Sequence, residues 1–308
     1  MNRAVTIGKT PAQLIWRRFR RHKLAVGSAL ALVILAIAAL LAPVFELGMG
    51  LDANAADLFK RFQGPSPTHP LGTDELGRDL FLRLLYGGRV SLLVGLVAAA
   101  FATVIGTAVG VMAGYFGGRT DAILMRVTDG VISLPLLPLL IVLAAIDLSK
   151  LGLPEAITEL ESAGLYRIIF IVSLAGWTTV ARVVRASTLS IKQRVFVMAA
   201  VAQGGDSLRI MRVHILPNLA SPIIVATTLA VGNIILLESV LSFLGLGIQP
   251  PLPSWGNLLT NAQEVIWEAP FQAFYPGLLI FATVIAFNFL GDGLQNALDP
   301  RATEGRVD

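Results

Sequence analysis

The amino-acid sequence predicts an all-α polytopic membrane protein with about six transmembrane helices. Of its 308 residues, 55% are hydrophobic and only 14% are charged, whereas soluble domains carry about 25% charged residues. The mean hydropathy is +0.73. A helix of roughly 20 apolar residues crosses a hydrocarbon core of about 30 Å and satisfies its own backbone hydrogen bonds. Suitable apolar segments lie near residues 24–45, 90–115, 127–147, 165–184, 219–246 and 274–291.

The first apolar segment, 24–45, follows a basic stretch and so has the layout of a secretory signal. Its apolar core is too long for that, because signal cores have about 7–15 residues. No clear small-x-small cleavage site follows it. We therefore expect a retained transmembrane helix at 24–45, preceded by a cytoplasmic N-terminal segment at 1–23.

Residues 46–88 are expected to form a long periplasmic loop. This range contains the sequence His69-Pro-Leu-Gly-Thr-Asp-Glu-Leu-Gly-Arg-Asp79. Its proline and glycine residues indicate an ordered segment rich in turns rather than a membrane span.

The second and third spans carry small or helix-breaking residues. Gly106, Gly110 and Gly114 repeat every four residues, which forms a face that another helix can approach closely. Pro135 and Pro138 predict a kink in the third span, because each proline removes a helix hydrogen bond and crowds the preceding turn.

The fourth span is the shortest, with only 14 uncharged residues from Ile168 to Ala181. Arg167 and Arg182 at its ends would have to extend their charged groups toward the two membrane interfaces.

A basic loop at 185–217 joins the fourth and fifth spans. Residues 190–203 are expected to form a short helix that exposes a flat, alanine-rich surface. Gly204 and Gly205 should end it, since glycine accepts the positive φ that helix ends favour.

A second short helix is expected to follow that break. Asp206 or Ser207 can cap its N-terminus, and it should continue through Val213. Pro217 would then mark the start of the fifth span. Alone, this pattern fits an ordinary amphipathic interfacial loop as well as a projection that docks into a cleft.

Lysine and arginine counts in the loops predict the orientation. With a cytoplasmic N-terminus, the inner side carries 17 of these residues and the outer side 7. Both termini and the 185–217 loop are therefore expected to be cytoplasmic. We divide the rest of the chain into a core of five helices at 89–301 and a cytoplasmic tail at 302–308.

The loop contains Met198-Ala-Ala-Val-Ala-Gln-Gly204 and, after nine residues, His214-Ile-Leu-Pro217. This spacing resembles the cytoplasmic loop by which permease subunits of bacterial ABC importers bind their ATPase. That family has Glu-Ala-Ala, three residues, Gly, nine residues, an often aliphatic position, one residue and Leu-Pro. Met198 replaces the usual Glu, and His214 occupies the often aliphatic position.

Four further segments fall in the same order as in the C-type permeases of dipeptide and oligopeptide ABC importers. The chain resembles these permeases across residues 69–301. The segments are His69 to Asp79, Leu241-Ser-Phe-Leu-Gly-Leu-Gly247, Gln249-Pro-Pro-Leu-Pro-Ser-Trp-Gly-Asn257, and Phe287-Asn-Phe-Leu-Gly-Asp-Gly-Leu294 with Asp299-Pro-Arg301.

The resemblance implies the transmembrane-domain fold of a type I ABC importer in the bacterial cytoplasmic (inner) membrane. It also implies three kinds of protein partner: a homologous B-type permease, two ATPase subunits and an external solute-binding protein. The residues expected to couple this chain to the ATPase are Met198, Ala199, Ala200, Gly204, Asp206 and Pro217.

No catalytic or metal-binding residues are expected in this chain. Ile7-Gly-Lys-Thr10 lacks the earlier glycine of a phosphate-binding loop, because Arg3 stands at that position. ATP and Mg²⁺ should therefore bind to the partner ATPase subunits. The three histidines are scattered, cysteine is absent, and the basic residues gathered at the inner membrane face make a nucleic-acid partner unnecessary.

Two acidic residues, Asp129 and Glu238, are candidates for the transport pathway. Both fall within or near apolar spans, where an ionisable side chain indicates function by default. Both also lie toward span ends, where they could instead reach water or a helix terminus.

The leading functional hypothesis is an ATP-driven importer subunit for small peptides. The same importer class also carries nickel chelates, glutathione and opines, and no residue of this chain selects among these solutes. A gradient-driven secondary transporter is the alternative from another class. It is disfavoured because the sequence shows no inverted repeat and few ionisable pairs in the middle of its spans.

Overall fold

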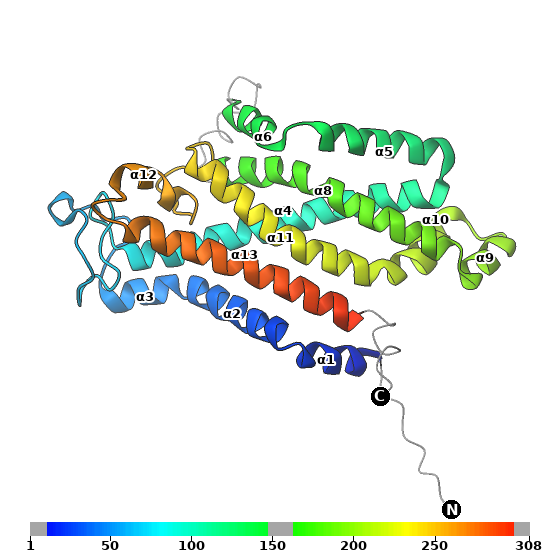
Figure 1. Ribbon diagram of the computed structural model, residues 1–308, viewed down its shortest axis with the longest axis horizontal. Helices are drawn as coiled ribbons and strands as arrows, with labels where there is room; N and C mark the ends of the chain where they lie inside the picture. Colours follow the sequence, from blue (N-terminus) through cyan, green and yellow to red (C-terminus); the bar gives the residue numbers. More distant parts are fainter. Residues whose placement is uncertain (1–10, 147–162, 299–308) are drawn as a thin grey trace, which may run out of the picture.

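The computed structural model describes residues 11–146 and 163–298. In this part of the chain nearly all regular structure is helical, and the long helices form an elongated bundle (Figure 1). The proposed tail at 302–308 and the first ten residues lie outside the described ranges. The main helices are α1 (Pro11–Arg21), α2 (Lys23–Leu40), α3 (Ala42–Met49), α4 (Leu80–Phe116), α5 (Gly118–Ser133), α6 (Leu136–Ala145), α8 (Ala163–Lys192), α9 (Val195–Ala202), α10 (Ser207–Ile210), α11 (Ala220–Phe243), α12 (Ala262–Val265) and α13 (Phe271–Leu298).

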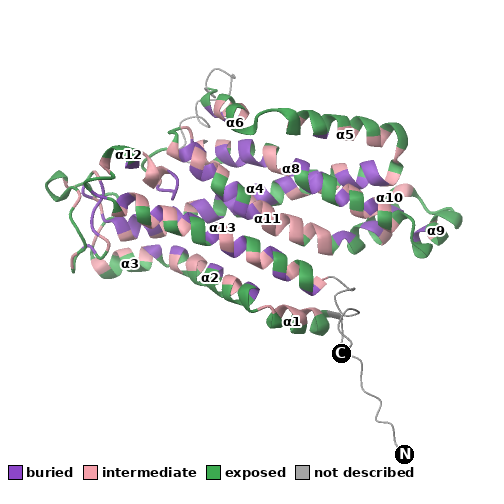
Figure 2. Ribbon diagram, in the orientation of Figure 1, coloured by how far each residue is buried: buried purple, intermediate pink, exposed green. Residues whose placement is uncertain are grey.

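The described helices account for about six membrane spans, as the sequence predicts. Five helical segments are individually long and apolar enough to cross a bilayer, and the bent pair α5 and α6 brings the number to six. Figure 2 shows many exposed residues along these helices. Large apolar side chains are among them, including Leu30, Phe101 and Phe281, each more than half exposed. Exposed apolar surface of this kind is expected where helices face lipid or other membrane helices.

The two ends of the bundle differ. We call the end that carries α9 the inner end and the opposite end the outer end. Helix α1 and the last turns of α13 lie at the inner end with α9, whereas α3 and α12 lie at the outer end (Figure 1). The start of the described chain in α1 and its end in the last turns of α13 thus lie on the same side, as an even number of spans requires.

The helix that contains the second span begins before the end of the expected loop. Helix α4 starts at Leu80, inside the 46–88 range that was assigned to the periplasmic loop. Asp79 caps it by accepting a hydrogen bond from Leu82 N at 2.8 Å. The apolar pattern does not indicate this helix start because Arg83 interrupts the apolar run, yet Arg83 is only 2% exposed. Residues between α3 and α4 form the ordered turns that the prolines and glycines predict.

Helices α4 and α8 approach closely through the predicted glycine face. Gly106, Gly110 and Gly114 are buried against α8. A Cβ atom placed on Gly106 would lie 2.6 Å from the carbonyl oxygen of Trp177, and one on Gly110 would lie 2.6 Å from that of Ala181. Separations under 3.0 Å require movement of the opposing backbone. The glycines therefore set the distance between these two helices.

The third span is kinked, as Pro135 and Pro138 predict. Helices α5 and α6 meet at an angle of 84° across a break at residues 134–135. Pro135 adopts an extended conformation as the N-cap of α6, which ends the preceding helix. The expected fourth span is longer than its uncharged core, because α8 extends beyond Arg167 and Arg182 at both ends.

A tryptophan fills the core near the outer end. Trp255 lies in the turn after α11 and is 2% exposed. Its indole Nε1 donates a hydrogen bond to Leu84 O at 3.0 Å, and its ring lies 2.8 Å from where a Cβ on Gly88 would stand. A buried indole needs such a partner for its N–H group. Residues 244–256, which follow α11, are here called the outer turn. Trp255 thus attaches the outer turn to the first turns of α4.

We expect Gly110→Leu to prevent stable folding, because the α4–α8 interface has no room for a side chain there. The expected loss is about 3 kcal/mol or more. Gly27→Leu is the matched control, since a Cβ on Gly27 meets no atom within 4 Å. Folded protein recovered from membranes and its thermal stability in detergent are the measurements. Equal behaviour of the two variants would contradict the close contact.

Candidate functional site

Helix α9 projects from the inner end of the bundle (Figure 1). Helix α8 ends at Lys192, and α9 begins three residues later at Val195 after Arg194 adopts an extended conformation. The helix runs to Ala202, so it ends one residue before the predicted limit at 203. It carries Met198, Ala199 and Ala200, three of the residues expected to couple this chain to an ATPase.

One face of α9 is apolar and exposed. Val195 is 78% exposed, and Met198 and Val201 are each 52% exposed. These residues are spaced by three, so they lie along one side of the helix. Ala199 is exposed and Ala200 half-buried. Exposed apolar surface beyond the ends of the long helices is typical of a protein contact site.

The buried side of α9 is marked by Val197, which the sequence analysis did not identify. Val197 is fully buried. It belongs to an apolar cluster, here called the inner cluster, that joins α9 to α4, α8 and the start of the fifth span. The inner cluster consists of Val111, Val180, Val184, Val197, Ile210, Ile215 and Leu219. No sequence signal separates Val197 from the neighbouring apolar residues of α9.

The predicted glycine break follows α9. Gly204 has φ +77°, a left-handed conformation that favours glycine. Gly204 N donates to Val201 O at 2.9 Å, and Gly205 N donates to Ala200 O at 3.0 Å. A Cβ on Gly205 would lie 2.8 Å from the oxygen of Ala200, so this glycine is required for close approach.

The second short helix begins where predicted. Asp206 is the N-cap of α10, and its carboxylate accepts a hydrogen bond from Leu208 N at 3.1 Å. Helical structure continues as a π-helical turn at Met211–Ile215 and a 3₁₀ turn at Leu216–Leu219. Pro217 lies in the first turn of the latter, where its missing N–H removes no hydrogen bond.

Polar contacts attach α8 to its neighbours at the inner end. Arg185 Nη2 donates to Asp121 Oδ2 at 2.6 Å, which joins α8 to α5. Asp129, a pathway candidate, forms an ion pair of 2.6 Å with Arg182. Both of these side chains are more than half exposed, so the pair is accessible to a ligand or to a neighbouring subunit.

Glu238, the second pathway candidate, is fully buried. Its carboxylate accepts hydrogen bonds from Ser242 Oγ at 2.7 Å and Ser91 Oγ at 3.2 Å. Ser91 Oγ in turn accepts from Trp255 N at 3.1 Å, and Ser242 Oγ accepts from Ile248 N at 3.2 Å. One carboxylate thus joins α4, α11 and the outer turn, and it is enclosed in this conformation.

Within the described ranges, no group of three or more His, Cys, Asp or Glu side chains could hold a metal ion. The three histidines lie apart. His22 accepts a hydrogen bond from Ala25 N, His69 contacts Asp79 at 2.9 Å, and the His214 ring lies 6.5 Å from that of Phe196.

We expect Glu238→Gln to preserve both stability and transport, because an amide can still bond the two serine hydroxyls. Glu238→Leu should destabilise the protein by about 2 kcal/mol or more, since Ser91 and Ser242 would lose a buried partner. Thermal unfolding in detergent and uptake in proteoliposomes are the measurements. Loss of transport in Glu238→Gln at unchanged stability would instead support a pathway role.

Comparison with known protein families covers most of the chain. Residues 106–304 match the family described as the inner membrane component of binding-protein-dependent transport systems. Residues 10–63 match the N-terminal transmembrane domain of oligopeptide transport permease C. The first match includes α5, α6, α8, the 185–217 loop and the later long helices α11 and α13.

Several curated proteins are similar over nearly their whole length. A glutathione transport system permease protein of Pectobacterium atrosepticum is 38% identical over 294 residues, covering 95% of this chain and 92% of that protein. A dipeptide transport system permease protein of Alkalihalophilus pseudofirmus is 37% identical, with 95% and 90% covered. An oligopeptide transport system permease protein of Bacillus subtilis is 36% identical, with 92% and 88% covered. The chain therefore belongs to the family of inner membrane components of binding-protein-dependent transport systems.

Proposed function

We propose that this chain is a permease subunit of an ATP-driven importer that carries dipeptides and oligopeptides across the bacterial cytoplasmic membrane. Two partner ATPase subunits would bind and hydrolyse ATP with Mg²⁺, and a solute-binding protein would deliver the peptide. The observation that carries this proposal is α9, an exposed apolar helix held rigidly at the inner end of a membrane bundle.

The inner cluster explains how movement of an ATPase would reach the membrane helices. A push on α9 acts on Val197, which is fully buried beside residues of α4, α8 and the segment leading into α11. Packed apolar side chains transmit displacement because close-packed interiors have low compressibility. The 185–217 loop would thus move with the bundle.

The individual coupling residues would have distinct roles. Met198, Ala199 and Ala200 would form the contact with the ATPase, and Gly204 would turn the chain away from it. Asp206 and Pro217 would hold the following turns. With Met198 in place of the usual Glu, the contact would rest on apolar packing, to which flexible methionine is suited.

A homologous B-type permease would complete the transport pathway. The α5–α6 pair exposes large apolar side chains such as Ile123, Val127 and Val142, which suit a neighbouring membrane helix or lipid. Asp129 lies on this part of the surface and remains a candidate to contact the solute. Glu238 would enter the pathway only if the outer turn opened.

The peptide assignment rests on the names of similar proteins. Two of those described above are named for dipeptides and oligopeptides and one for glutathione. Glutathione is itself a tripeptide with one γ-linked bond, so small peptides are the solute class that these names share. Glutathione is accordingly the second candidate solute.

A gradient-driven transporter would work without an ATPase. The importer hypothesis is tested by uptake of radiolabelled dipeptide into vesicles that contain this chain and its co-purifying B-type permease, with the solute-binding protein supplied outside. Uptake is measured with and without the co-purifying ATPase subunits and internal ATP. We expect uptake only with both. Uptake that persists without ATPase and collapses with an ionophore would replace the proposal with the gradient-driven transporter.

We expect Gly204→Asp to abolish ATP-driven uptake while the protein still inserts into the membrane. The added charge would lie beside the docking helix, at a position whose φ is +77°. Gly204→Asn is the matched control, because asparagine tolerates the left-handed conformation without adding charge. Uptake and solute-stimulated ATP hydrolysis are measured in proteoliposomes. Wild-type uptake by Gly204→Asp would argue against a docking role.

A further inference from the structure

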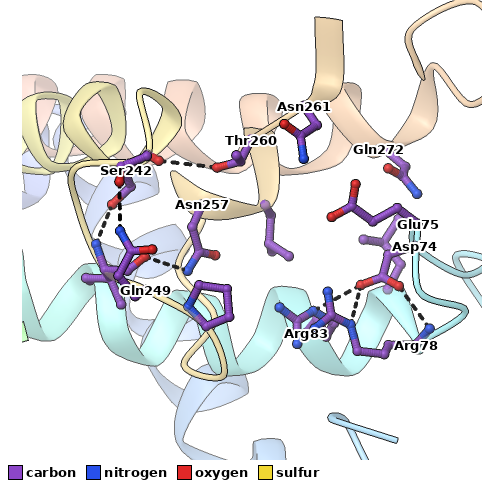
Figure 3. Close-up of a pocket in the computed structure, with 15 residues that line it drawn as sticks. Asp74, Glu75, Arg78, Arg83, Ser242, Gln249, Asn257, Thr260, Asn261 and Gln272 are labelled. Atoms are coloured by element: carbon purple, nitrogen blue, oxygen red, sulfur yellow. Dashed lines mark hydrogen bonds and ion pairs between the residues drawn. The ribbon is translucent and has the colours of Figure 1, made fainter. Parts of the chain in front are cut away.

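The outer end of the bundle contains a polar pocket of about 220 Å³. Its walls come from three places: the turn before α4 with the start of that helix, the turns after α11, and the start of α13 (Figure 3). Its polar lining residues include Asp74, Glu75, Arg78, Arg83, Asn261 and Gln272.

Asp74 lies between the two arginines, and its hydrogen-bonding capacity is largely used. Its Oδ1 accepts from the backbone N–H groups of Leu76 and Arg78, both at 2.9 Å. Its Oδ2 accepts from Arg78 Nε at 2.7 Å and lies 3.3 Å from Arg83 Nε. A single carboxylate therefore serves two guanidinium groups that offer ten N–H donors together.

The arginine donors are not used up by this contact. Arg83 is 2% exposed, and its Nε has no hydrogen-bond partner in the described part of the chain. Its Nη1 donates to Asn54 at 3.3 Å, close to the distance limit for such a bond. Amide groups of Asn261 and Gln272 lie on the far wall (Figure 3). A pocket with surplus planar donors suits a carboxylate, which arginine binds through paired hydrogen bonds.

Glu75 is the local competitor for these donors. Its carboxylate lies above the arginines in Figure 3, at the edge of the same pocket. The described residues give it no ion pair within 4.0 Å. A third carboxylate entering the pocket would be repelled by Asp74 and Glu75 and attracted by Arg78 and Arg83.

The size and place of the pocket indicate which carboxylate would enter. Pockets for small-molecule ligands measure about 300–1,000 Å³, so this one is too small for most peptides. A pocket of this size can take one side chain, and single side chains that fill a pocket often carry much of the binding energy at a protein interface. The elements that line it lie at the outer end, opposite the proposed ATPase site (Figure 1).

We propose that this pocket receives one aspartate or glutamate side chain of the solute-binding protein when that protein docks on the outer face. This inference rests on the proposed function, because it needs a binding protein that delivers the solute. Arg78 and Arg83 hold the entering carboxylate, and Glu75 limits the affinity so that the binding protein can leave again.

Affinity measurements on the complete importer test this assignment. The complex is placed in lipid nanodiscs, and binding of the purified solute-binding protein that supports its peptide uptake is measured as Kd. Arg78→Gln should weaken binding by about tenfold or more, and Glu75→Gln should tighten it by about threefold. Arg61→Gln is the matched control, because Arg61 is an exposed cation at the same end that lies outside the pocket.

A double-mutant cycle identifies the entering residue. Acidic residues on the binding protein are changed singly to Asn or Gln, and each variant is measured against wild-type importer and Arg78→Gln. One acidic position should lose affinity with wild-type importer and lose no more with Arg78→Gln, which is the mark of direct coupling. Glu75→Gln keeps the test decisive if Arg78→Gln fails to assemble.

The outcomes separate this inference from the proposed function. Unchanged Kd in both Arg78→Gln and Glu75→Gln, with the wild type binding normally, would overturn the pocket assignment alone. A changed apparent KM for peptide uptake at unchanged Kd would make the pocket a solute subsite and would also overturn it. Failure of the wild-type complex to bind any such protein would instead refute the proposed function.

Discussion

The close contact between α4 and α8 is the constraint on which the rest of the structure depends. Gly106 and Gly110 let the two backbones approach until a single added carbon would clash. In a membrane, where apolar burial gives little net drive for helices to associate, such contact is a main source of stability. The pair of α4 and α8 is here called the spine. Residues of the spine contact other elements at both ends of the bundle.

At the inner end the spine holds the inner cluster, which contains Val111 of α4, Val184 of α8 and Val197 of α9. At the outer end α4 supplies Ser91 to the buried carboxylate of Glu238. The inner end thus presents an exposed apolar helix, whereas the outer end is held by the hydrogen bonds of Glu238 and by the buried ring of Trp255.

Much of this arrangement could be predicted from local sequence. Apolar runs predicted the spans, Pro135 predicted the kink, and Gly204 predicted the end of α9, and the structure contains all three. The remainder depends on contacts between distant residues. Glu238 and Ser91 are 147 positions apart, so no local pattern indicates that the carboxylate is enclosed by serines. The start of α4 is likewise not evident from the apolar pattern, because Arg83 interrupts the apolar run and its burial depends on the fold.

The central claim, that the exposed face of α9 contacts an ATPase, can be tested by cross-linking in native membranes. The chain has no cysteine, so a single Met198→Cys provides one defined attachment point. A short thiol-to-amine reagent should join this variant to an ATPase subunit, with the product identified by mass spectrometry. Phe281→Cys, exposed on α13 within the bundle, should give no such product. Absence of the Met198→Cys product while an ATPase still co-purifies would contradict the account.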